Sequence, residues 1–289
     1  MPRSDGATAA GGRIARFARA EGSLRCPVCS GRVSLAGTSL RCESGHAFDV
    51  SARGYANFLP HQRPLKGYDR KFFRRRRAMM ERGLYDHIVD AVLDAAGRAL
   101  SGRAGQALAV DAGCGEGSYA RALRGRLGCD VLAFDVSKDA AYVAAGGGAD
   151  VLWAVADVAR IPVADEAADL VLDAFTPANY REFSRILRPG GCIVKVVPGP
   201  FHMRELRHAA RHAIRSESYS NERVVEHFAA CADLVNRARA TRTVELRDGE
   251  ARDLAGMSPV LFGASERDVA AIELDRITVD AEVLVGRRR

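Results

Sequence analysis

The chain has 289 residues, a length that allows one large α/β domain with a small module beside it. Apolar residues form 47% of the sequence, which is enough for a sizeable core. No stretch approaches the ~20 consecutive apolar residues that a membrane helix needs. The first 22 residues lack the apolar segment of a secretory signal, so we expect a disordered tail over 1–22.

The basic residues behind the formal net charge of +7 are concentrated in one segment. Between Pro60 and Arg82 there are nine basic and two acidic residues, and nine minus two equals the excess of the whole chain. A focused basic patch is typical of a protein that binds a polyanion. A solvated linker is the alternative explanation of such a run.

Three cysteines and one histidine have the spacing of a structural zinc site. The pattern is C-x2-C-x12-C-x3-H, and its members are Cys26, Cys29, Cys42 and His46. Three thiolates and one imidazole complete a tetrahedral zinc site and leave no position for a substrate. The module around them is too short to bury a core of its own, so the metal would supply its folding free energy.

The other cysteines do not form a second pattern. They are scattered singly at positions 114, 129, 192 and 231, and the total of seven is odd. This distribution favours a reducing compartment over a disulfide framework, so we expect a cytoplasmic protein.

A glycine-rich turn organises the rest of the chain. Residues 107–110 predict a buried strand and residues 118–127 predict a helix, because apolar residues recur there at helical spacing. The glycines between them form G-x-G-x-G, which differs from the G-x-G-x-x-G of dinucleotide-binding loops. Asp111 precedes the first glycine, and Asp135 ends the next apolar run. This order predicts the opening unit of a nucleotide-binding α/β sheet, and an ordinary strand-to-helix turn is the alternative.

The remaining sequence alternates between predicted strands and predicted helices. Apolar runs predict strands over 131–134, 151–155, 168–172 and 192–197. Alternating side chains predict two closing strands over 239–246 and 277–285. Together with the strand at 107–110, these runs predict an α/β protein with a seven-stranded, mostly parallel sheet.

The turn and its acids resemble the nucleotide loop of class I S-adenosylmethionine (AdoMet) methyltransferases. The resemblance implies a Rossmann-like domain whose loop packs against the methionine part of AdoMet. The loop residues assigned to the cofactor are Asp111, Gly113, Gly115, Glu116 and Gly117. Asp135 would bind the ribose hydroxyls, because a carboxylate accepts two hydrogen bonds from a diol. Asp157, after the strand predicted over 151–155, would meet the adenine amino group.

Three segments near the amino terminus resemble a more specific family. They are L-R-C-P-V-C over 24–29, L-R-C-E-S-G-H-A-F-D over 40–49 and G-Y-A-N-F-L-P over 54–60. They are similar to the zinc domain of bacterial 23S rRNA guanine-N1 methyltransferases, which include macrolide self-resistance proteins. The resemblance implies structural zinc, a homodimer, and methylation of a guanine in a 23S rRNA hairpin near the peptide exit tunnel. It also implies that Tyr85 lies over AdoMet and that His202 lines the cofactor site.

The basic segment and the fourth strand complete the predicted site. Arginine can pair with phosphate and stack on bases, so the segment is expected to face RNA. The expected RNA-binding residues are Arg70, Lys71, Arg74, Arg75 and Arg76. Asp173, which follows the strand predicted over 168–172, is the candidate to orient or accept the proton of guanine N1. The predicted division is a tail (1–22), a zinc-binding domain (23–60), a basic linker and helix (61–83) and a methyltransferase domain (84–289).

Two other functions fit parts of the sequence. A small-molecule methyltransferase from an antibiotic pathway would share the AdoMet loop but would need neither the zinc module nor the basic segment. A non-catalytic RNA-binding protein would keep the zinc module and the basic segment but would not bind AdoMet. AdoMet binding and the identity of the methyl acceptor separate the three.

Overall fold

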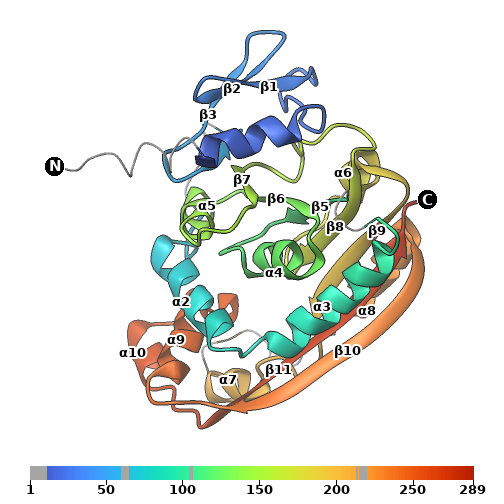
Figure 1. The fold of residues 1–289 in the computed structure, drawn as a ribbon. Helices are drawn as coiled ribbons and strands as arrows, with labels where there is room; N and C mark the ends of the chain where they lie inside the picture. Colours follow the sequence, from blue (N-terminus) through green and yellow to red (C-terminus); the bar gives the residue numbers. More distant parts are fainter. Residues whose placement is uncertain (1–11, 60–64, 104–106, 213, 215–219) are drawn as a thin grey trace, which may run out of the picture.

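The protein is built around a central β-sheet (Figure 1). The computed structural model describes residues 12–59, 65–103, 107–212, 214 and 220–289. The strands of the sheet lie in the order β10-β11-β9-β8-β5-β6-β7-β4. The parallel strands are β4 (Tyr55–Asn57), β5 (Leu108–Ala112), β6 (Asp130–Asp135), β7 (Leu152–Val155), β8 (Ala168–Ala174) and β9 (Leu187–Pro198). An antiparallel strand pair, β10 (Asp233–Glu245) and β11 (Arg276–Arg287), extends the sheet beyond β9.

The sheet has eight strands rather than the predicted seven. The additional strand is β4, which pairs in parallel with β7 and places Tyr55 opposite Trp153. This segment falls within the zinc-binding domain predicted over 23–60. A strand of three residues carries no periodicity, so only its pairing with β7 reveals it.

Helices cover the two faces of the sheet in three layers. One face is covered by α2 (Arg70–Glu81), α3 (Asp86–Ala99), α4 (Ser118–Leu127) and α5 (Lys138–Ala145). The other face is covered by α6 (Tyr180–Ile186) and α8 (Glu222–Cys231), which share their core with the zinc-binding module. Consecutive residues of β5 alternate between the two cores, with Ala109 in one and Val110 in the other. Burial on both faces explains why these strands are continuous apolar runs.

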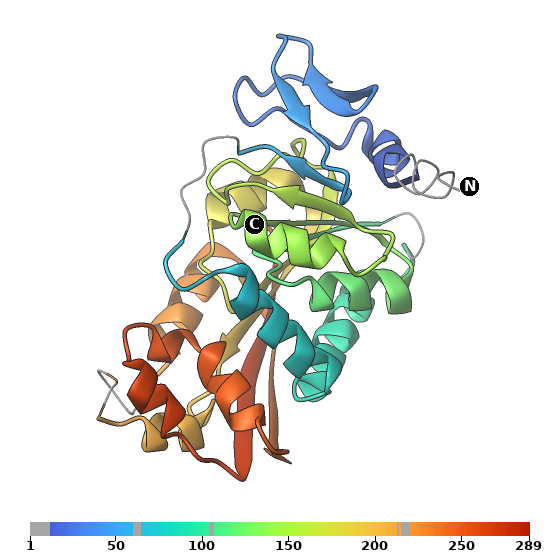
Figure 2. The ribbon, with the colours of Figure 1, turned by 90° about the vertical axis from the view of Figure 1, so that its left-hand side faces the viewer.

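Short helices cluster at one end of the β10–β11 strand pair, on the side away from the zinc-binding module (Figure 2). They are α7 (Arg204–Ala209), α9 (Glu250–Gly256), η2 (Pro259–Leu261) and α10 (Glu266–Ala270). In this view α2 crosses the molecule between these helices and the zinc-binding module. None of the helices in the described ranges has the length and apolar character needed to cross a bilayer.

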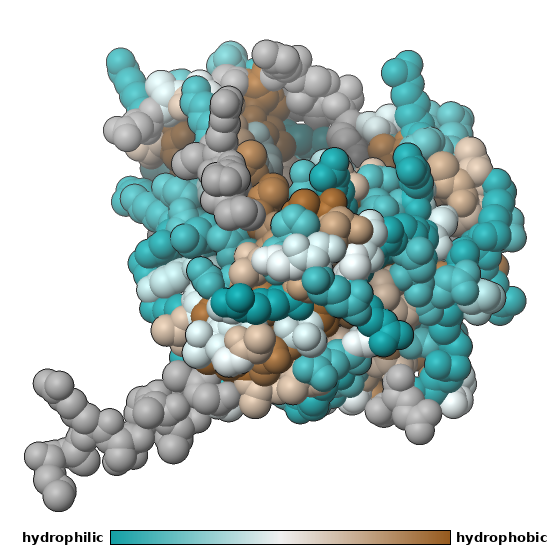
Figure 3. All heavy atoms as spheres, turned by 90° about the horizontal axis from the view of Figure 1, so that it is seen from above, coloured by the Kyte–Doolittle hydropathy of each residue, from teal (hydrophilic) through white to brown (hydrophobic). Residues whose placement is uncertain are grey.

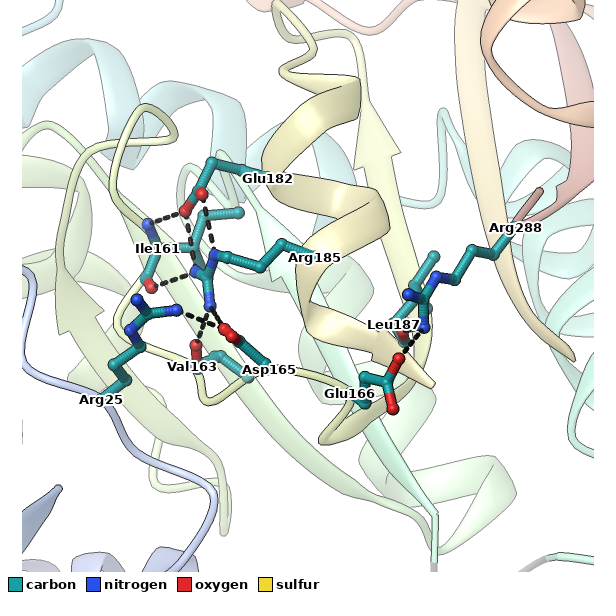
Figure 4. Close-up of polar contacts among 9 residues, drawn as sticks. All are labelled: Arg25, Ile161, Val163, Asp165, Glu166, Glu182, Arg185, Leu187 and Arg288. Atoms are coloured by element: carbon teal, nitrogen blue, oxygen red, sulfur yellow. Dashed lines mark hydrogen bonds and ion pairs between the residues drawn. The ribbon is translucent and has the colours of Figure 1, made fainter. Parts of the chain in front are cut away.

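A small three-stranded sheet forms the amino-terminal module. It consists of β1 (Val33–Ala36), β2 (Ser39–Cys42) and β3 (Ala47–Asp49), which pair antiparallel. Its base is tied to the loop before β8, because the Ala164 N–H donates to the Ser23 carbonyl at 2.8 Å. Arg25 pairs with Asp165, which also accepts from Arg185 of α6 at 2.7 Å (Figure 4). The module is therefore docked on the large domain rather than tethered loosely.

The predicted disordered tail is wrong for residues 12–22. A 3-10 helix, η1 (Arg16–Ala20), buries Phe17 to 1% exposure in the core beneath the module. Arg16 donates to the Ala149 carbonyl at 2.7 Å, and Arg19 pairs with Asp150. One aromatic anchor and two arginines thus fix a segment whose composition is otherwise typical of a tail. Residues 1–11, residue 60 of the predicted zinc-binding domain and residues 61–64 of the predicted basic linker lie outside the described residues.

Candidate active site and metal centre

The four predicted zinc ligands come together at one point of the small sheet. The possible ligand atoms of Cys26, Cys29, Cys42 and His46 all lie within 4.8 Å of one another. The Cys29 and Cys42 sulfurs are 3.6 Å apart, and His46 Nδ1 lies 3.3 Å from the Cys42 sulfur. Tetrahedral ligation with Zn–S bonds of ~2.3 Å requires sulfur separations of about 3.8 Å. The donor set and its spacing therefore fit structural zinc.

Two tight turns hold these ligands. In the first, the Ser30 N–H donates to the Cys26 carbonyl at 2.9 Å. In the second, the Gly45 N–H donates to the Cys42 carbonyl at 3.0 Å, and the His46 N–H points at the Cys42 sulfur at 3.3 Å. Backbone donors near a sulfur stabilise its thiolate form, which is the form that binds metal.

The cofactor loop lies between β5 and α4, and its three glycines have left-handed backbone conformations. Their φ angles are 76° at Gly113, 56° at Gly115 and 85° at Gly117. A Cβ atom at Gly113 would lie 2.5 Å from Thr176, and one at Gly117 would lie 2.5 Å from Trp153. These two glycines are required by both conformation and packing, whereas the surroundings of Gly115 stay open to about 3.8 Å.

Asp135 lies at the end of β6, directly beside this loop. Its two carboxylate oxygens accept from the Gly115 N–H at 3.0 Å and the Ser137 N–H at 2.7 Å. Burial raises the pKa of Asp135 to about 6, while these two N–H groups lower it. The backbone therefore fixes the carboxylate at the edge of the sheet, where its remaining lone pairs can accept a diol.

Asp111 and Glu116 are buried within the same loop. One carboxylate oxygen of Asp111, Oδ2, has no hydrogen-bond partner. Burial, with added repulsion from Glu116 and Asp135, raises the pKa of Asp111 to about 8. A buried carboxyl with an unpaired oxygen beside a glycine-rich loop indicates a site for a positively charged ligand.

Asp157 follows β7 and lies on the surface. Its Oδ1 accepts from the Ala159 N–H at 2.9 Å, which orders the turn after the strand. The neighbouring Ala156 N–H donates to the Asp135 carbonyl at 3.1 Å, so the two acids follow adjacent strand ends. Carboxyl ends of parallel strands form the ligand crevice of open α/β sheets.

Aromatic rings close the site on the side of β8. The Tyr85 and His202 ring centroids both lie near Phe175, at 6.4 Å and 5.6 Å. Phe175 has a left-handed backbone, with φ of 58°, and its N–H donates to the Val196 carbonyl at 3.0 Å. Such a conformation is strained for a bulky residue and is typical of functional sites. The predicted positions of Tyr85 and His202 are thus brought together, and sequence reasoning missed Phe175 between them.

A buried aspartate of β11 holds the histidine loop. The Phe201 N–H donates to Asp280 Oδ2 at 2.8 Å, and His202 Nδ1 lies 2.9 Å from the Asp280 carbonyl oxygen. His202 Nδ1 also lies 3.3 Å from the Asp280 backbone nitrogen, so both backbone groups of Asp280 hold the imidazole ring. Burial lowers the pKa of His202 to about 4, so the ring is neutral at physiological pH.

Asp173 is fully buried at the end of β8 and forms an ion pair. Lys195 Nζ of β9 lies 2.7 Å from Asp173 Oδ2 and also donates to the Thr176 carbonyl at 3.2 Å. Burial raises the pKa of Asp173 to about 6, and Lys195 opposes that rise. The pair therefore braces residues 173–176, which pack against Gly113 of the cofactor loop.

Comparison with known proteins identifies the family of the chain. Residues 24–64 match the family model described as "RlmA, N-terminal", and residues 110–194 match "Methyltransferase domain". A Bacillus subtilis protein named "Putative 23S rRNA (guanine-N(1)-)-methyltransferase YxjB" is 37% identical over 92% of this chain and 97% of its own length. A Streptomyces fradiae protein named "23S rRNA (guanine(748)-N(1))-methyltransferase" is 33% identical over 82% of this chain and 84% of its own length. The chain belongs to the RlmA family of methyltransferases.

The RlmA assignment confirms the expected fold class, an AdoMet-dependent methyltransferase domain with an amino-terminal zinc ribbon. Among solved structures, one titled "Crystal structure of MccD protein" matches with a TM-score of 0.46 and 16% identity, covering 69% of this chain and 96% of that chain. At that score and identity the likeness adds nothing to the RlmA assignment.

The basic helix of this RlmA protein does not present all its predicted RNA-binding residues to solvent. Lys71 and Arg74 are exposed. Arg70 is exposed but paired with Asp139, and Arg75 lies 3.3 Å from Asp253. Arg76 differs from all of them, because its Nε donates to the buried Glu116 of the cofactor loop at 2.9 Å. The expectation that Arg76 faces RNA is corrected by this inward contact.

The inward contacts of Lys195 and Arg76 are two features of the site that the sequence does not predict. Lys195 is a single cation inside an apolar strand, and that position is itself a signal of a buried partner. Arg76 lies within a run of four arginines, where only the helical period distinguishes the inward side chain from its neighbours.

Proposed function

We propose that the protein transfers a methyl group from AdoMet to N1 of a guanine in a hairpin of 23S rRNA near the peptide exit tunnel. The main support is that relatives named for this activity match both the zinc ribbon and the cofactor domain, over 82% and 92% of this chain. A role in macrolide resistance, a homodimer and a cytoplasmic location belong to the same proposal. The name of the Streptomyces fradiae relative supports methylation of a related guanine.

The main task of the protein in this reaction is to position the guanine relative to the methyl group of AdoMet. Bound AdoMet supplies a methyl group on a positively charged sulfur, and the methyl–sulfur bond breaks as the N1–methyl bond forms. N1 lies on the Watson–Crick edge of guanine, so the base must be unpaired or flipped out before it can react. Holding N1 in line with the methyl group accounts for most of the rate gain, because orientation replaces a bimolecular encounter.

Loss of the N1 proton is the second requirement, and Asp173 is the proposed residue for it. Asp173 is fully buried against Lys195, with Oδ1 lacking a hydrogen-bond partner. That arrangement supports an orienting role, in which the ion pair holds residues 173–176 toward the acceptor base. A carboxylate whose pKa is raised to about 6 remains charged at pH 7 and keeps Lys195 paired.

The proposed RNA face combines the exposed part of α2 with the zinc ribbon. Lys71 and Arg74 project to solvent from α2, and Arg53 projects from the turn that follows the ribbon sheet. The Arg53 and Arg70 guanidinium groups lie on the Tyr142 ring, at 4.0 Å and 3.9 Å from its centroid. Viewed from the ribbon end, the surface is largely hydrophilic (Figure 3). Such a face suits the phosphates and splayed bases of an RNA loop.

Reverse transcription tests the proposal directly. Purified protein is incubated with AdoMet and 23S rRNA, with a parallel reaction that omits AdoMet, and a primer is extended across the product. N1 methylation blocks base pairing, so we expect a strong AdoMet-dependent stop one nucleotide before a single guanine. A product that shows no new stop, together with label transfer to a purified macrolide, would instead support the small-molecule methyltransferase.

A further inference from the structure

The inward arginine of the basic helix, Arg76, lies beside the cofactor loop. Arg76 extends from α2, the helix that otherwise carries the exposed Lys71 and Arg74. Its Nε lies 2.9 Å from Glu116 Oε2 and 4.0 Å from the point where a Cβ of Gly115 would be. Its guanidinium carbon lies 5.7 Å from the centroid of the Tyr85 ring.

The surroundings of Arg76 include most of the predicted cofactor residues. Its positive charge acts on Asp135, on His202 and on Tyr119, as well as on its partner Glu116. Tyr119 is buried at the start of α4 and its hydroxyl has no hydrogen-bond partner. This hydroxyl and Oδ2 of Asp111 are two buried polar atoms that a bound ligand could pair with.

The charges of this site match the amino-acid end of AdoMet. AdoMet carries a sulfonium, an ammonium and one carboxylate. An acidic pocket attracts the two positive groups but repels the carboxylate. Asp111, Glu116 and Asp135 supply the acids. Arg76 supplies a guanidinium whose planar fork pairs with a carboxylate through two parallel hydrogen bonds.

We propose that Arg76 binds the carboxylate of the methionine moiety of AdoMet, and that Glu116 holds the guanidinium in position for it. The Nε of Arg76 is engaged by Glu116. Within the described residues, the two terminal nitrogens of Arg76 make no hydrogen bond, whereas Arg70, Arg75 and Arg77 of the same helix are paired. Glu116 is thus a positioning residue, and α2 joins the cofactor site to the proposed RNA face. This inference rests on the proposed function only for the identity of the cofactor.

Calorimetry with two ligands isolates the carboxylate contact. AdoMet and decarboxylated AdoMet, which differ only in that group, are titrated into the zinc-loaded protein without RNA. A charge-assisted pair contributes enough for AdoMet to bind about 10- to 100-fold more tightly. In Arg76→Gln the AdoMet affinity should fall by that factor while the decarboxylated ligand is little affected, so the ratio approaches one.

Matched variants exclude a general loss of structure. Arg74→Gln removes an exposed charge from the same helix and should keep the wild-type ratio of affinities. The double variant Arg76→Gln/Glu116→Gln removes the unpaired buried acid and should show the same ratio near one, with zinc content and Tm retained. Arg76→Lys should keep a reduced preference for AdoMet, because its ammonium pairs without the planar fork.

Two results would overturn the assignment. One is a wild-type protein that binds both ligands equally. The other is an Arg76→Gln protein, folded and zinc-loaded, that keeps the full preference for AdoMet. Because neither titration contains RNA, a failure here leaves the rRNA methylation assay unaffected, and a failure of that assay leaves the titrations interpretable.

Discussion

The zinc ribbon and the cofactor sheet differ in what holds their functional residues in place. The zinc ribbon brings four ligands together within 21 residues of sequence, and its three strands have three or four residues each. The cofactor site draws on segments from α2 to β11, and its side chains are positioned by burial on both faces of a large sheet. Substitution of a zinc ligand should therefore act by releasing the metal, whereas substitution of a residue in the sheet site should remove only the contact that this residue makes.

The largest expected effect is on the ribbon. We expect Cys26→Ser to lose zinc and to lower rRNA methylation at least about 100-fold, because structural zinc contributes ~10–16 kcal/mol to such modules. AdoMet affinity should change by less than about threefold. Metal analysis, RNA binding and calorimetry check the three parts.

A matched cysteine provides the control for this prediction. Cys231 lies on α8, partly exposed and outside the ligand cluster, so Cys231→Ser should keep zinc and activity. Full methylation by a zinc-free Cys26→Ser protein would contradict the separate roles of the two regions.

The second effect concerns the ribose contact in the sheet. We expect Asp135→Ala to weaken AdoMet binding by about 10- to 100-fold, since two hydrogen bonds to a charged acceptor are lost. Zinc content and RNA binding should stay at the wild-type level, in contrast to Cys26→Ser. Calorimetry makes the measurement, with the partly exposed Asp139→Asn, outside the cofactor loop, as control. Unchanged affinity in Asp135→Ala would remove this residue from the cofactor site.

The third prediction concerns the buried ion pair between Asp173 and Lys195. We expect Asp173→Asn to lower kcat by about tenfold or more with little change in AdoMet affinity, because Lys195 loses its charged partner. The double variant Asp173→Asn/Lys195→Met should recover part of that rate if the pair only braces residues 173–176. Single-turnover methylation makes the comparison, and no recovery would point to direct proton acceptance by Asp173.

The last effect is a pH dependence of AdoMet affinity that arises in the sheet site. Burial raises the pKa of Asp111 to about 8, so the free protein carries this carboxyl protonated at pH 7. The positively charged AdoMet favours the ionised form, and binding below pH 8 must release a proton. AdoMet affinity should therefore rise by up to about tenfold per pH unit between pH 6 and 8 and level off above. Asp111→Asn should flatten the profile, and an equally steep profile in that variant would exclude Asp111 as the cause.

The same contrast explains how far sequence reasoning reached. The zinc ligands could be predicted because metal ligation depends on local spacing, and the glycine loop could be predicted because its turn chemistry is local. The eighth strand, the ordered segment at Phe17 and the inward turn of Arg76 could not, because each depends on a partner distant in sequence. Arg76 is the clearest case, since the composition of its helix indicates RNA while its contact is with the cofactor loop.

Analysis of the modified nucleoside tests the central claim most directly. Labelled AdoMet, zinc-loaded protein and 23S rRNA are incubated, and the rRNA is digested to nucleosides and examined by mass spectrometry. The account predicts about one 1-methylguanosine per rRNA molecule, and a much lower yield in the same time when Cys26→Ser or Asp135→Ala replaces the wild type under limiting AdoMet. Label on another nucleoside, or rRNA that takes up no methyl group from a folded and zinc-loaded protein, would contradict it.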